Sequence, residues 1–277
     1  MAEKGPIGVF DSGYGGLTVL KSLVKKLPNY DFLYLGDNAR TPYGTRSFQT
    51  IYQYSLQAVK YLFDQGCPLI IVACNTASAK ALRNIQQKDL PKIAPDRRVL
   101  GVIRPTTESI GHFTASRHIG ILGTKGTIQS ESYLIEINKF FPDIRVSQEI
   151  CPMWVPLVEN GEQDGAGADY FVQKNLDQIL KADHKIDTLL LACTHYPLLI
   201  PKIKKYLPPH IKIIDQGKIV ADSLAEYLHR HPEIEKRLLK SRSIKFFTTD
   251  DENTFNEKAT LFYGRKTIAE KTDLNIG

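Results

Sequence analysis

Two cysteines of this chain stand directly after apolar runs, and each is followed by hydrogen-bonding side chains. Cys74 ends the run LIIVAC before Asn75 and Thr76, and Cys193 ends the run TLLLAC before Thr194 and His195. Buried cysteine is common and usually inert, so either cysteine alone would favour a structural role. The repetition of the same pattern at two strand ends favours a functional pair.

Two thiols are suited to inverting a carbon stereocentre. Inversion removes a proton from one face of the carbon and returns one to the other face, so it needs two opposed acid/base groups. A reference pKa of about 8.5 lets one cysteine act as a thiolate and the other as a thiol near neutral pH. His195 could accept a proton from Cys193 or stabilise its thiolate. An amide hydrolase using Cys193 and His195 is an alternative, although it would not need Cys74.

The glycine-rich turn FDSGYGGLT invites a comparison with dinucleotide-binding units. Gly13 and Gly15 form a G-x-G motif, and Asp37 follows at about the expected interval of 20 residues. However, Thr18 occupies the third glycine position, and the carboxylate of Asp11 would repel a pyrophosphate. We therefore expect Asp11 to face an ammonium group or to take part in proton transfer.

Two loops are further candidates for ligand contacts. The Pro-Tyr-Gly segment at 40–46 could offer backbone N–H groups to a carboxylate, or it could be an ordinary surface turn. The apolar, proline-interrupted segment at 151–161 contains Glu159, and the residues alone do not choose between a site acid and an exposed one. The C-x-H spacing at Cys193 is weak as a metal motif, and the glycine turn does not match the dinucleotide fingerprint, so we expect neither a metal nor a cofactor.

The elements that must position these residues alternate between strands and helices. Near-continuous apolar strands separated by helices are typical of parallel sheets covered on both faces, and ligands of such sheets bind beyond the carboxyl ends of the strands. The expected strands are 7–10, 31–36, 69–74, 98–103, 118–123, 188–193 and 211–215, and the expected helices are 17–26, 50–65, 77–87, 129–140, 168–181 and 219–228.

An internal similarity indicates two halves. The stretch IGVFDSGYGGLTVL at 7–20 resembles HIGILGTKGTIQSESYL at 118–134, since both combine a strand, a polar glycine turn and a helix start. The two cysteine strand ends are separated by a similar interval. We expect two related α/β halves that face each other, each supplying one cysteine to a site between them.

Composition limits the remaining classes. The 277 residues are 42% hydrophobic and 24% charged, and no apolar run approaches the roughly 20 residues of a membrane span. The four cysteines include no C-x-x-C pair, and the N-terminus carries no apolar signal core, so we expect free thiols in the cytoplasm. The net charge of +6 is dispersed, which favours solvated surface over nucleic-acid binding. The densest basic stretch, 229–245, resembles an exposed helix face.

The sequence resembles the glutamate racemases, a cofactor-independent family that supplies D-glutamate for peptidoglycan. The similar stretches follow the family's order and extend over nearly the whole chain from Ile7: GVFDSGYGGLTVL, GDNARTPYGTRS, IVACNTASA, GVIRPT, LGTKGTIQS, CPMWVPLVE and LACTHYPLL.

The resemblance implies roles for individual residues. Cys74 would take the α-proton from D-glutamate and Cys193 would take it from L-glutamate, assisted by Asp11 and His195, with Glu159 as a further catalytic candidate. The implied substrate contacts are Asp11, Ser12, Tyr43, Gly44, Asn75, Thr76, Thr124, Thr194 and His195.

The resemblance also implies a fold and an assembly. The expected architecture is two similar, doubly wound α/β domains with mostly parallel sheets, the first formed by 1–98 and 212–277 and the second by 99–211. A homodimer is implied, with L- or D-glutamate as the small-molecule partner and no nucleic acid or membrane. Arg104 departs from the family, which commonly has an acidic residue there. Racemisation of another acidic amino acid such as aspartate, or non-catalytic binding of one, are the alternatives.

Overall fold

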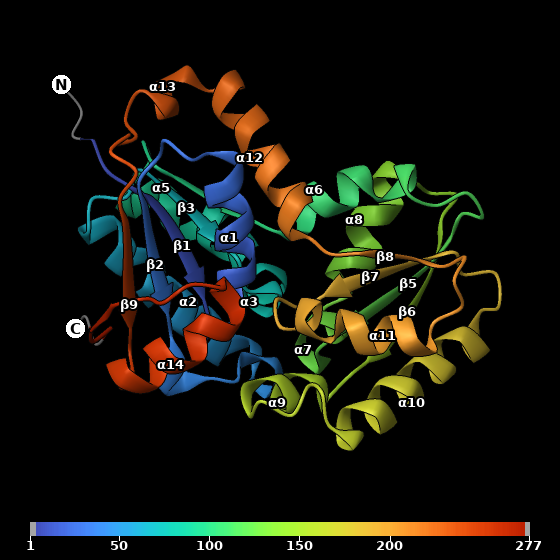
Figure 1. Ribbon diagram of the computed structural model, residues 1–277. Helices are drawn as coiled ribbons and strands as arrows, with labels where there is room; N and C mark the ends of the chain where they lie inside the picture. Colours follow the sequence, from blue (N-terminus) through green and yellow to red (C-terminus); the bar gives the residue numbers. More distant parts are fainter. Residues whose placement is uncertain (1–3, 275–277) are drawn as a thin grey trace.

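The computed structural model describes residues 4–274, which form two parallel sheets arranged side by side (Figure 1). The first sheet has six strands in the order β10-β9-β2-β1-β3-β4, and the second has four in the order β6-β5-β7-β8. The strands of the first sheet are β1 (Ile7–Asp11), β2 (Phe32–Gly36), β3 (Leu69–Val72), β4 (Arg98–Gly101), β9 (Ile244–Thr248) and β10 (Ala269–Lys271). Those of the second are β5 (His118–Gly123), β6 (Arg145–Ile150), β7 (Thr188–Ala192) and β8 (Lys212–Ile214).

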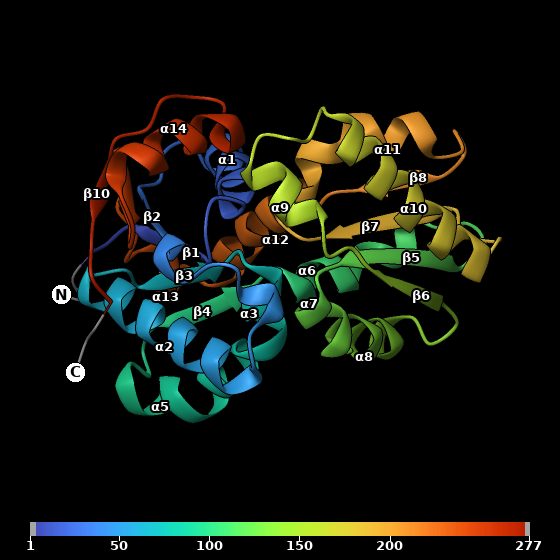
Figure 2. The same ribbon diagram turned by 90° about the horizontal axis from the view of Figure 1, so that it is seen from below.

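Helices cover both faces of the first sheet, which explains its continuously apolar strands (Figures 1 and 2). Along β1, Ile7 and Val9 pack with the core under α1, whereas Phe10 packs with the core under α2, as the two-residue period of a strand requires. On the α1 side lie α1 (Gly16–Lys26), α12 (Gly217–Arg230), α13 (Pro232–Glu235) and α14 (Glu252–Tyr263). On the other lie α2 (Phe48–Asp64), α3 (Asn75–Lys80), α4 (Leu82–Asn84), the π-helix η3 (Ile85–Asp89) and α5 (Leu90–Ile93), while η1 (Asn38–Arg40) and η2 (Tyr43–Thr45) follow β2.

The second sheet is also covered on both faces (Figure 2). One face carries α6 (Ile103–Ser109), η4 (Ile110–His112), α7 (Lys125–Gln129) and α8 (Ser132–Phe140). The other carries α9 (Trp154–Glu159), α10 (Ala166–Ala182), η5 (Tyr196–Leu199) and α11 (Ile200–Tyr206). The two α/β units with parallel sheets that the sequence predicts are therefore present.

The chain crosses between the sheets twice, and its C-terminal part returns to complete the first sheet. The register Leu69↔Arg98 places β4 in the first sheet, and the register Thr188↔Lys212 places β8 in the second. Sheet pairing thus puts the crossings after Gly101 and after Ile214, three residues beyond each expected domain boundary. The boundaries 98/99 and 211/212 themselves remain a prediction.

Several elements differ from those expected. The helix predicted at 77–87 is broken into α3, α4 and the π-helix, and the one predicted at 129–140 is broken into α7 and α8 by Glu131, whose φ is +56°. The stretch 229–245 is not one helix face, since α12 ends at Arg230 and β9 begins at Ile244. Strands β6, β9 and β10 and helix α14 were not expected.

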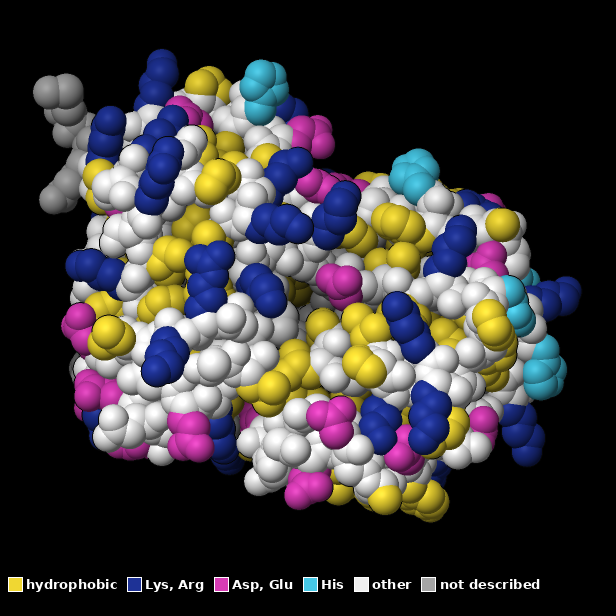
Figure 3. Space-filling model, viewed as in Figure 1, with side chains coloured by type: hydrophobic (Ala, Val, Ile, Leu, Met, Phe, Trp, Pro, Cys, Tyr) yellow, Lys and Arg dark blue, Asp and Glu magenta, His cyan; other side chains and the backbone are white. Residues whose placement is uncertain are grey.

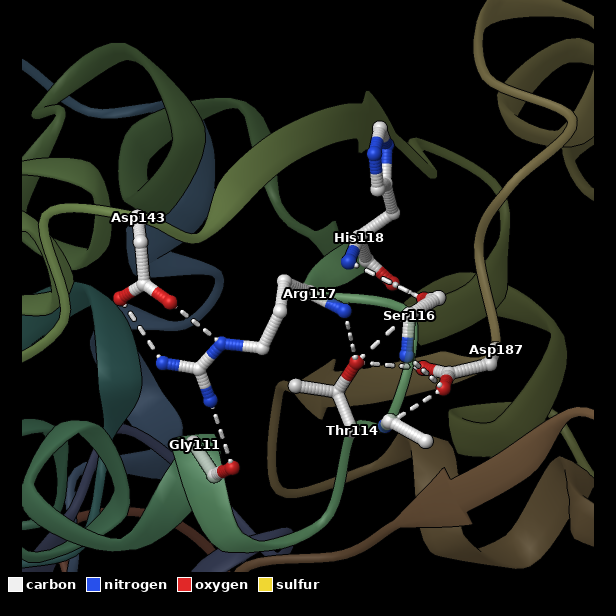
Figure 4. Close-up of polar contacts among 8 residues, drawn as sticks. Gly111, Thr114, Ser116, Arg117, His118, Asp143 and Asp187 are labelled. Atoms are coloured by element: carbon white, nitrogen blue, oxygen red, sulfur yellow. Dashed lines mark hydrogen bonds and ion pairs between the residues drawn. The ribbon is translucent and has the colours of Figure 1, made fainter.

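The amino-terminal edge of the second sheet is held by one aspartate (Figure 4). The Asp187 carboxylate accepts hydrogen bonds from Thr114 Oγ1 at 2.6 Å and from the backbone N–H groups of Ala115 and Ser116 at 2.7 and 2.8 Å. Beside it, the Arg117 guanidinium pairs with Asp143 at 2.7 and 2.8 Å. This cluster lies at the opposite strand ends from the cysteines, so it stabilises the connection into β5 rather than a site.

The surface shows basic side chains spread over both halves of the visible face rather than gathered in one patch, and a narrow hollow where the halves meet (Figure 3). Within residues 4–274, the helices are all too short or too polar to cross a membrane.

Candidate active site

The carboxyl ends of β1, β3, β5 and β7 face one another across the junction of the two halves. Thr194 Oγ1, after β7, donates to Asp11 Oδ2 at the end of β1 over 3.4 Å. Thr18 Oγ1 of α1 donates to the Thr194 carbonyl oxygen over 3.0 Å. Residues that the sequence places at separate strand ends are therefore brought together between the sheets.

Cys74 lies two residues beyond β3, immediately before the first residue of α3. Its thiol is buried and donates a hydrogen bond to Ser12 Oγ over 3.5 Å. Burial raises the pKa of the Cys74 thiol to about 12, and the nearby Asp11 carboxylate adds to the increase. Cys74 is consequently a protonated thiol at neutral pH, able to donate a proton.

Cys193 lies directly after β7 and belongs to a chain of three groups. Its Sγ is 3.9 Å from Nδ1 of His195, and Nε2 of the same ring is 3.0 Å from Oε1 of Glu159 on α9. Burial favours the neutral ring, but the interactions with Cys193 and Glu159 prevail and raise the pKa of His195 to about 10. An imidazolium at this position stabilises a Cys193 thiolate, which is the form that can remove a proton.

The His195 ring is also covered by the C-terminal part of the chain. Phe262 of α14 packs against it edge to face, with ring centroids 5.3 Å apart and an interplanar angle of 84°. This contact covers part of the ring, which is only 4% exposed.

Asp11 is fully buried at the end of β1. Its Oδ1 accepts the backbone N–H of Gly13 at 3.0 Å, a donor that a phosphate would otherwise take. Burial raises the pKa of Asp11, against the opposing influence of His195 and its hydrogen bonds. A buried carboxylate with this environment is suited to an ammonium group, which would compensate its charge.

A cluster of hydroxyl groups lies between the first turns of α3 and α7. Thr76 Oγ1 lies 3.0 Å from Thr124 Oγ1 and 3.3 Å from Thr127 Oγ1. Gly44 packs so closely that a Cβ there would lie 2.9 Å from Thr124 Cβ, so its backbone approaches the cluster as no larger residue could. These groups offer several adjacent donors to a carboxylate ligand.

Tyr43 has its hydroxyl group engaged away from this cluster. It donates to Asp37 Oδ2, and the same carboxylate accepts Arg40 Nε at 2.7 Å and Thr249 Oγ1 at 2.9 Å. Asp37, which the sequence offered only as part of a nucleotide motif, therefore holds the Tyr43–Gly44 turn in place.

Asn75 contacts two residues that sequence reasoning missed. Its Nδ2 donates to Gln216 Oε1 over 2.8 Å, and its Oδ1 accepts from the Tyr133 hydroxyl over 2.5 Å. Gln216 lies two residues beyond β8, so its place at a strand end was the one available signal. Tyr133 lies inside an expected helix, and nothing in the sequence around it indicated a role in the site.

Two other expectations concern metals and Arg104. Over residues 4–274, His, Cys, Asp and Glu side chains form no group of three or more that could hold a metal ion. Arg104 lies outside the site, on α6, with its side chain 74% exposed and paired to Glu108 at 2.8 Å.

Comparison of the sequence with known protein families identifies the family of this chain. A sequence model described as Asp/Glu/Hydantoin racemase matches residues 7–224. The chain belongs to the Asp/Glu/hydantoin racemase family. Within it, the chain is 42% identical over 270 residues to the glutamate racemase of Persephonella marina, with 97% of each chain covered. It is 38% identical to that of Streptococcus gordonii, covering 97% of this chain and 98% of the relative.

Solved structures of the family have the same two-sheet architecture. The glutamate racemase isoform RacE1 of Bacillus anthracis has a TM-score of 0.89 at 34% identity, with 99% of both chains covered. The Francisella tularensis glutamate racemase, solved in complex with D-glutamate, has a TM-score of 0.86 at 33% identity, with 98% of both covered. The fold class expected from the sequence, two α/β units with mostly parallel sheets, is confirmed.

Proposed function

We propose that this protein is an isomerase that interconverts L-glutamate and D-glutamate by a two-thiol mechanism requiring neither metal nor cofactor. The main support is that buried Cys74 and Cys193 follow equivalent strands of facing sheets, in a chain similar over nearly its full length to glutamate racemases. The neighbouring polar groups match the substrate: Asp11 for the ammonium, and the hydroxyl cluster with Asn75 for carboxylates.

The proposed chemistry conserves every proton. Starting from L-glutamate, the Cys193 thiolate removes the α-proton, and the electron pair of the broken C–H bond remains on the substrate. The Cys74 thiol then donates its proton to the opposite face, giving D-glutamate, a Cys193 thiol and a Cys74 thiolate. The reverse reaction uses the same groups with roles exchanged, and proton exchange with water restores the resting state.

The side chains around each thiol support this division of roles. His195, protonated through its contacts with Cys193 and Glu159, stabilises the thiolate that acts on L-glutamate. The high pKa of Cys74 makes it the proton donor in that direction. In the reverse direction the substrate ammonium beside Asp11 would offset the carboxylate charge and ease ionisation of Cys74.

The proposal extends to the cellular location, the assembly and the biological role of the protein. A cytoplasmic homodimer supplying D-glutamate for peptidoglycan fits the resemblance to the family. The dispersed basic side chains on the surface support a function without nucleic acid (Figure 3).

The test compares substrates and thiol variants. Purified protein dialysed against a chelator is incubated with L-glutamate or L-aspartate while circular dichroism of the amino acid is followed. We expect loss of the glutamate signal, little change with aspartate, and no inversion by folded Cys74→Ala or Cys193→Ala. Binding without inversion would indicate a binding protein. Inversion by Cys74→Ala near the parent rate would refute the two-thiol mechanism.

A further inference from the structure

A buried chain of hydrogen bonds runs from Asn75 through both halves of the molecule. It links Asn75 on α3 to Tyr133 on α8 and to Gln216, which immediately precedes α12; the three side chains are only 3%, 1% and 5% exposed. From Gln216 it continues to Thr106 on α6. Helices α3, α6 and α12 meet where the two halves join (Figure 1). The network therefore connects the first half, both crossings and the second half.

The Val102 carbonyl can only accept, and Gln216 Nε2 lies 3.2 Å from it, which fixes the orientation of the Gln216 amide and, through it, the direction of every contact in this network. The Asn75 Oδ1 atom can only accept, so the Tyr133 hydroxyl must donate to it over 2.5 Å. The Tyr133 oxygen then accepts from Gln216 Nε2 over 2.6 Å, leaving Gln216 Oε1 to accept from Asn75 Nδ2 over 2.8 Å. Thr106 Oγ1 donates to the Val102 carbonyl over 2.9 Å and shares the second N–H of Gln216 with that carbonyl, over 2.9 and 3.2 Å.

The result is that the Asn75 amide is held at both ends. If the amide were rotated by 180°, its NH₂ group would face the Tyr133 hydroxyl, whose oxygen already accepts from Gln216 Nε2. Its oxygen would then face Gln216 Oε1, and two acceptors cannot bond to each other. One Nδ2 hydrogen is used by Gln216, and among the described residues the structure shows no protein acceptor for the other. That second N–H, on the residue directly after Cys74, is the one left for a ligand.

We propose that Tyr133 and Gln216 are positioning residues that lock the Asn75 amide with its free N–H directed to the substrate, and that they transmit the relative placement of the two halves to this contact. The role attributed to Asn75 rests on the proposed function. The hydrogen bonds that form the lock do not depend on that function. A hydrogen bond that binds substrate and transition state equally changes KM and leaves kcat nearly unchanged.

The kinetic test uses Tyr133→Phe and Gln216→Met, each alone and combined with Asn75→Ala. The equilibrium constant of a racemisation is unity, so kcat/KM is the same for both enantiomers, and KM and kcat must be measured separately. We expect either substitution to raise KM for both enantiomers by about tenfold, with kcat within about threefold of the parent. In the Asn75→Ala background, Tyr133→Phe should change KM no further, because the group it positions is absent.

A matched control separates positioning from loss of stability. Tyr52→Phe on α2 removes another tyrosine hydroxyl bond, to Asp89 of η3 at 2.7 Å, and should leave KM unchanged. A folded Tyr133→Phe with KM near the parent value, or with the same effect whether or not Asn75 is present, would overturn the proposal.

A second measurement does not depend on catalysis. In ¹⁵N-asparagine-labelled, ligand-free protein, the Asn75 side-chain NH₂ should exchange slowly with water, and Tyr133→Phe should accelerate that exchange by at least about tenfold, while Tyr52→Phe should not. Equal exchange in all three proteins would refute the lock even if glutamate is racemised. Accelerated exchange in a protein that does not racemise glutamate would support the lock and refute the proposed function alone.

Discussion

Nε2 of His195 lies 3.0 Å from Oε1 of Glu159, so an acid from α9 of the second half bonds to the ring that also contacts the Cys193 thiol. Proteins commonly orient an active imidazole by bonding its second nitrogen to a carboxylate. This relationship gives Glu159, which the sequence left open between a site acid and an exposed one, a specific effect on His195.

Replacing Glu159 by glutamine should lower the pKa of His195 from about 10, because the substitution removes one of the two interactions that oppose burial. His195 would then lose its proton at a lower pH, and the alkaline decline of turnover should move to lower pH. Hydrogen bonds to charged groups contribute about 1.5–3 kcal/mol, so we expect kcat to fall by at least about tenfold. Imidazole NMR titration and a pH profile measure both effects; an unchanged His195 titration would contradict them.

Replacing Asp11 by asparagine should reduce turnover by roughly 10²–10⁴-fold if its role in proton transfer or ammonium binding is direct. The same change should lower the pKa of Cys74, since the Asp11 charge contributes to its increase. The measurement is kcat together with the pH dependence of alkylation of Cys74, identified by mass spectrometry. Parent-like turnover in a folded variant would make Asp11 a turn residue.

Heavy water should distinguish product from substrate early in the reaction. The thiol that donates a proton to the product has exchanged its own proton with heavy water while the site was open. The proton removed from the substrate is carried by the other thiol. Product should therefore carry deuterium at Cα while the remaining substrate stays largely unlabelled, as mass spectrometry of the separated enantiomers would show. Product retaining the original hydrogen would indicate transfer by a single base.

Gly15→Ala should impair activity more than stability. A Cβ at Gly15 would lie 2.5 Å from His195 Nδ1 and would also overlap Thr194 Oγ1, so the side chains of Thr194 and His195 in the second half must shift relative to the first. We expect kcat/KM to fall at least about tenfold, as sub-ångström misplacement of reacting groups is costly. Gly167→Ala, where the nearest atom would lie 3.7 Å away, is the matched control with near-parent activity. Equal kinetics in the two variants would show that the halves tolerate the shift.

Asp187→Asn should lower stability in a pH-dependent way. Although partial burial opposes ionisation, hydrogen bonds from Thr114, Ser116 and Ala115 lower the pKa of Asp187. Its stabilisation is therefore complete above the unfolded pKa of about 4 and is lost as pH falls through the folded value. We expect about 1–2 kcal/mol at pH 7 for this partly exposed group, shrinking on acidification. Urea unfolding at several pH values measures it, and a pH-independent difference would exclude this explanation.

The sequence predicted the strands that are apolar on both faces, because a buried parallel strand leaves an unbroken run such as LIIV. It did not predict β6, whose residues are only partly buried and mostly polar, because an edge strand lacks that pattern. The break at Glu131 was also missed, because no glycine marks its left-handed backbone in the sequence.

The site residues were predictable where they follow strands or belong to a family motif. Cys74, Cys193 and their neighbours were found in this way, and the structure brings them together. The contacts that orient them were not predicted, because Tyr133 is an ordinary helix residue, Gln216 offers only its place after a strand, and both meet Asn75 only through the fold. Their roles in the reaction remain predictions.

The edge contact of Phe262 with His195 has a consequence during protein synthesis. All four strands of the second sheet have been translated before β9, β10 and α14 leave the ribosome, so that half can fold first. The ring face of His195 then stays open to water until the final helix docks. In a nascent chain that lacks α14, both cysteines and the histidine are already translated, but the site around them is incomplete. We therefore expect activity to begin only after α14 has emerged from the ribosome.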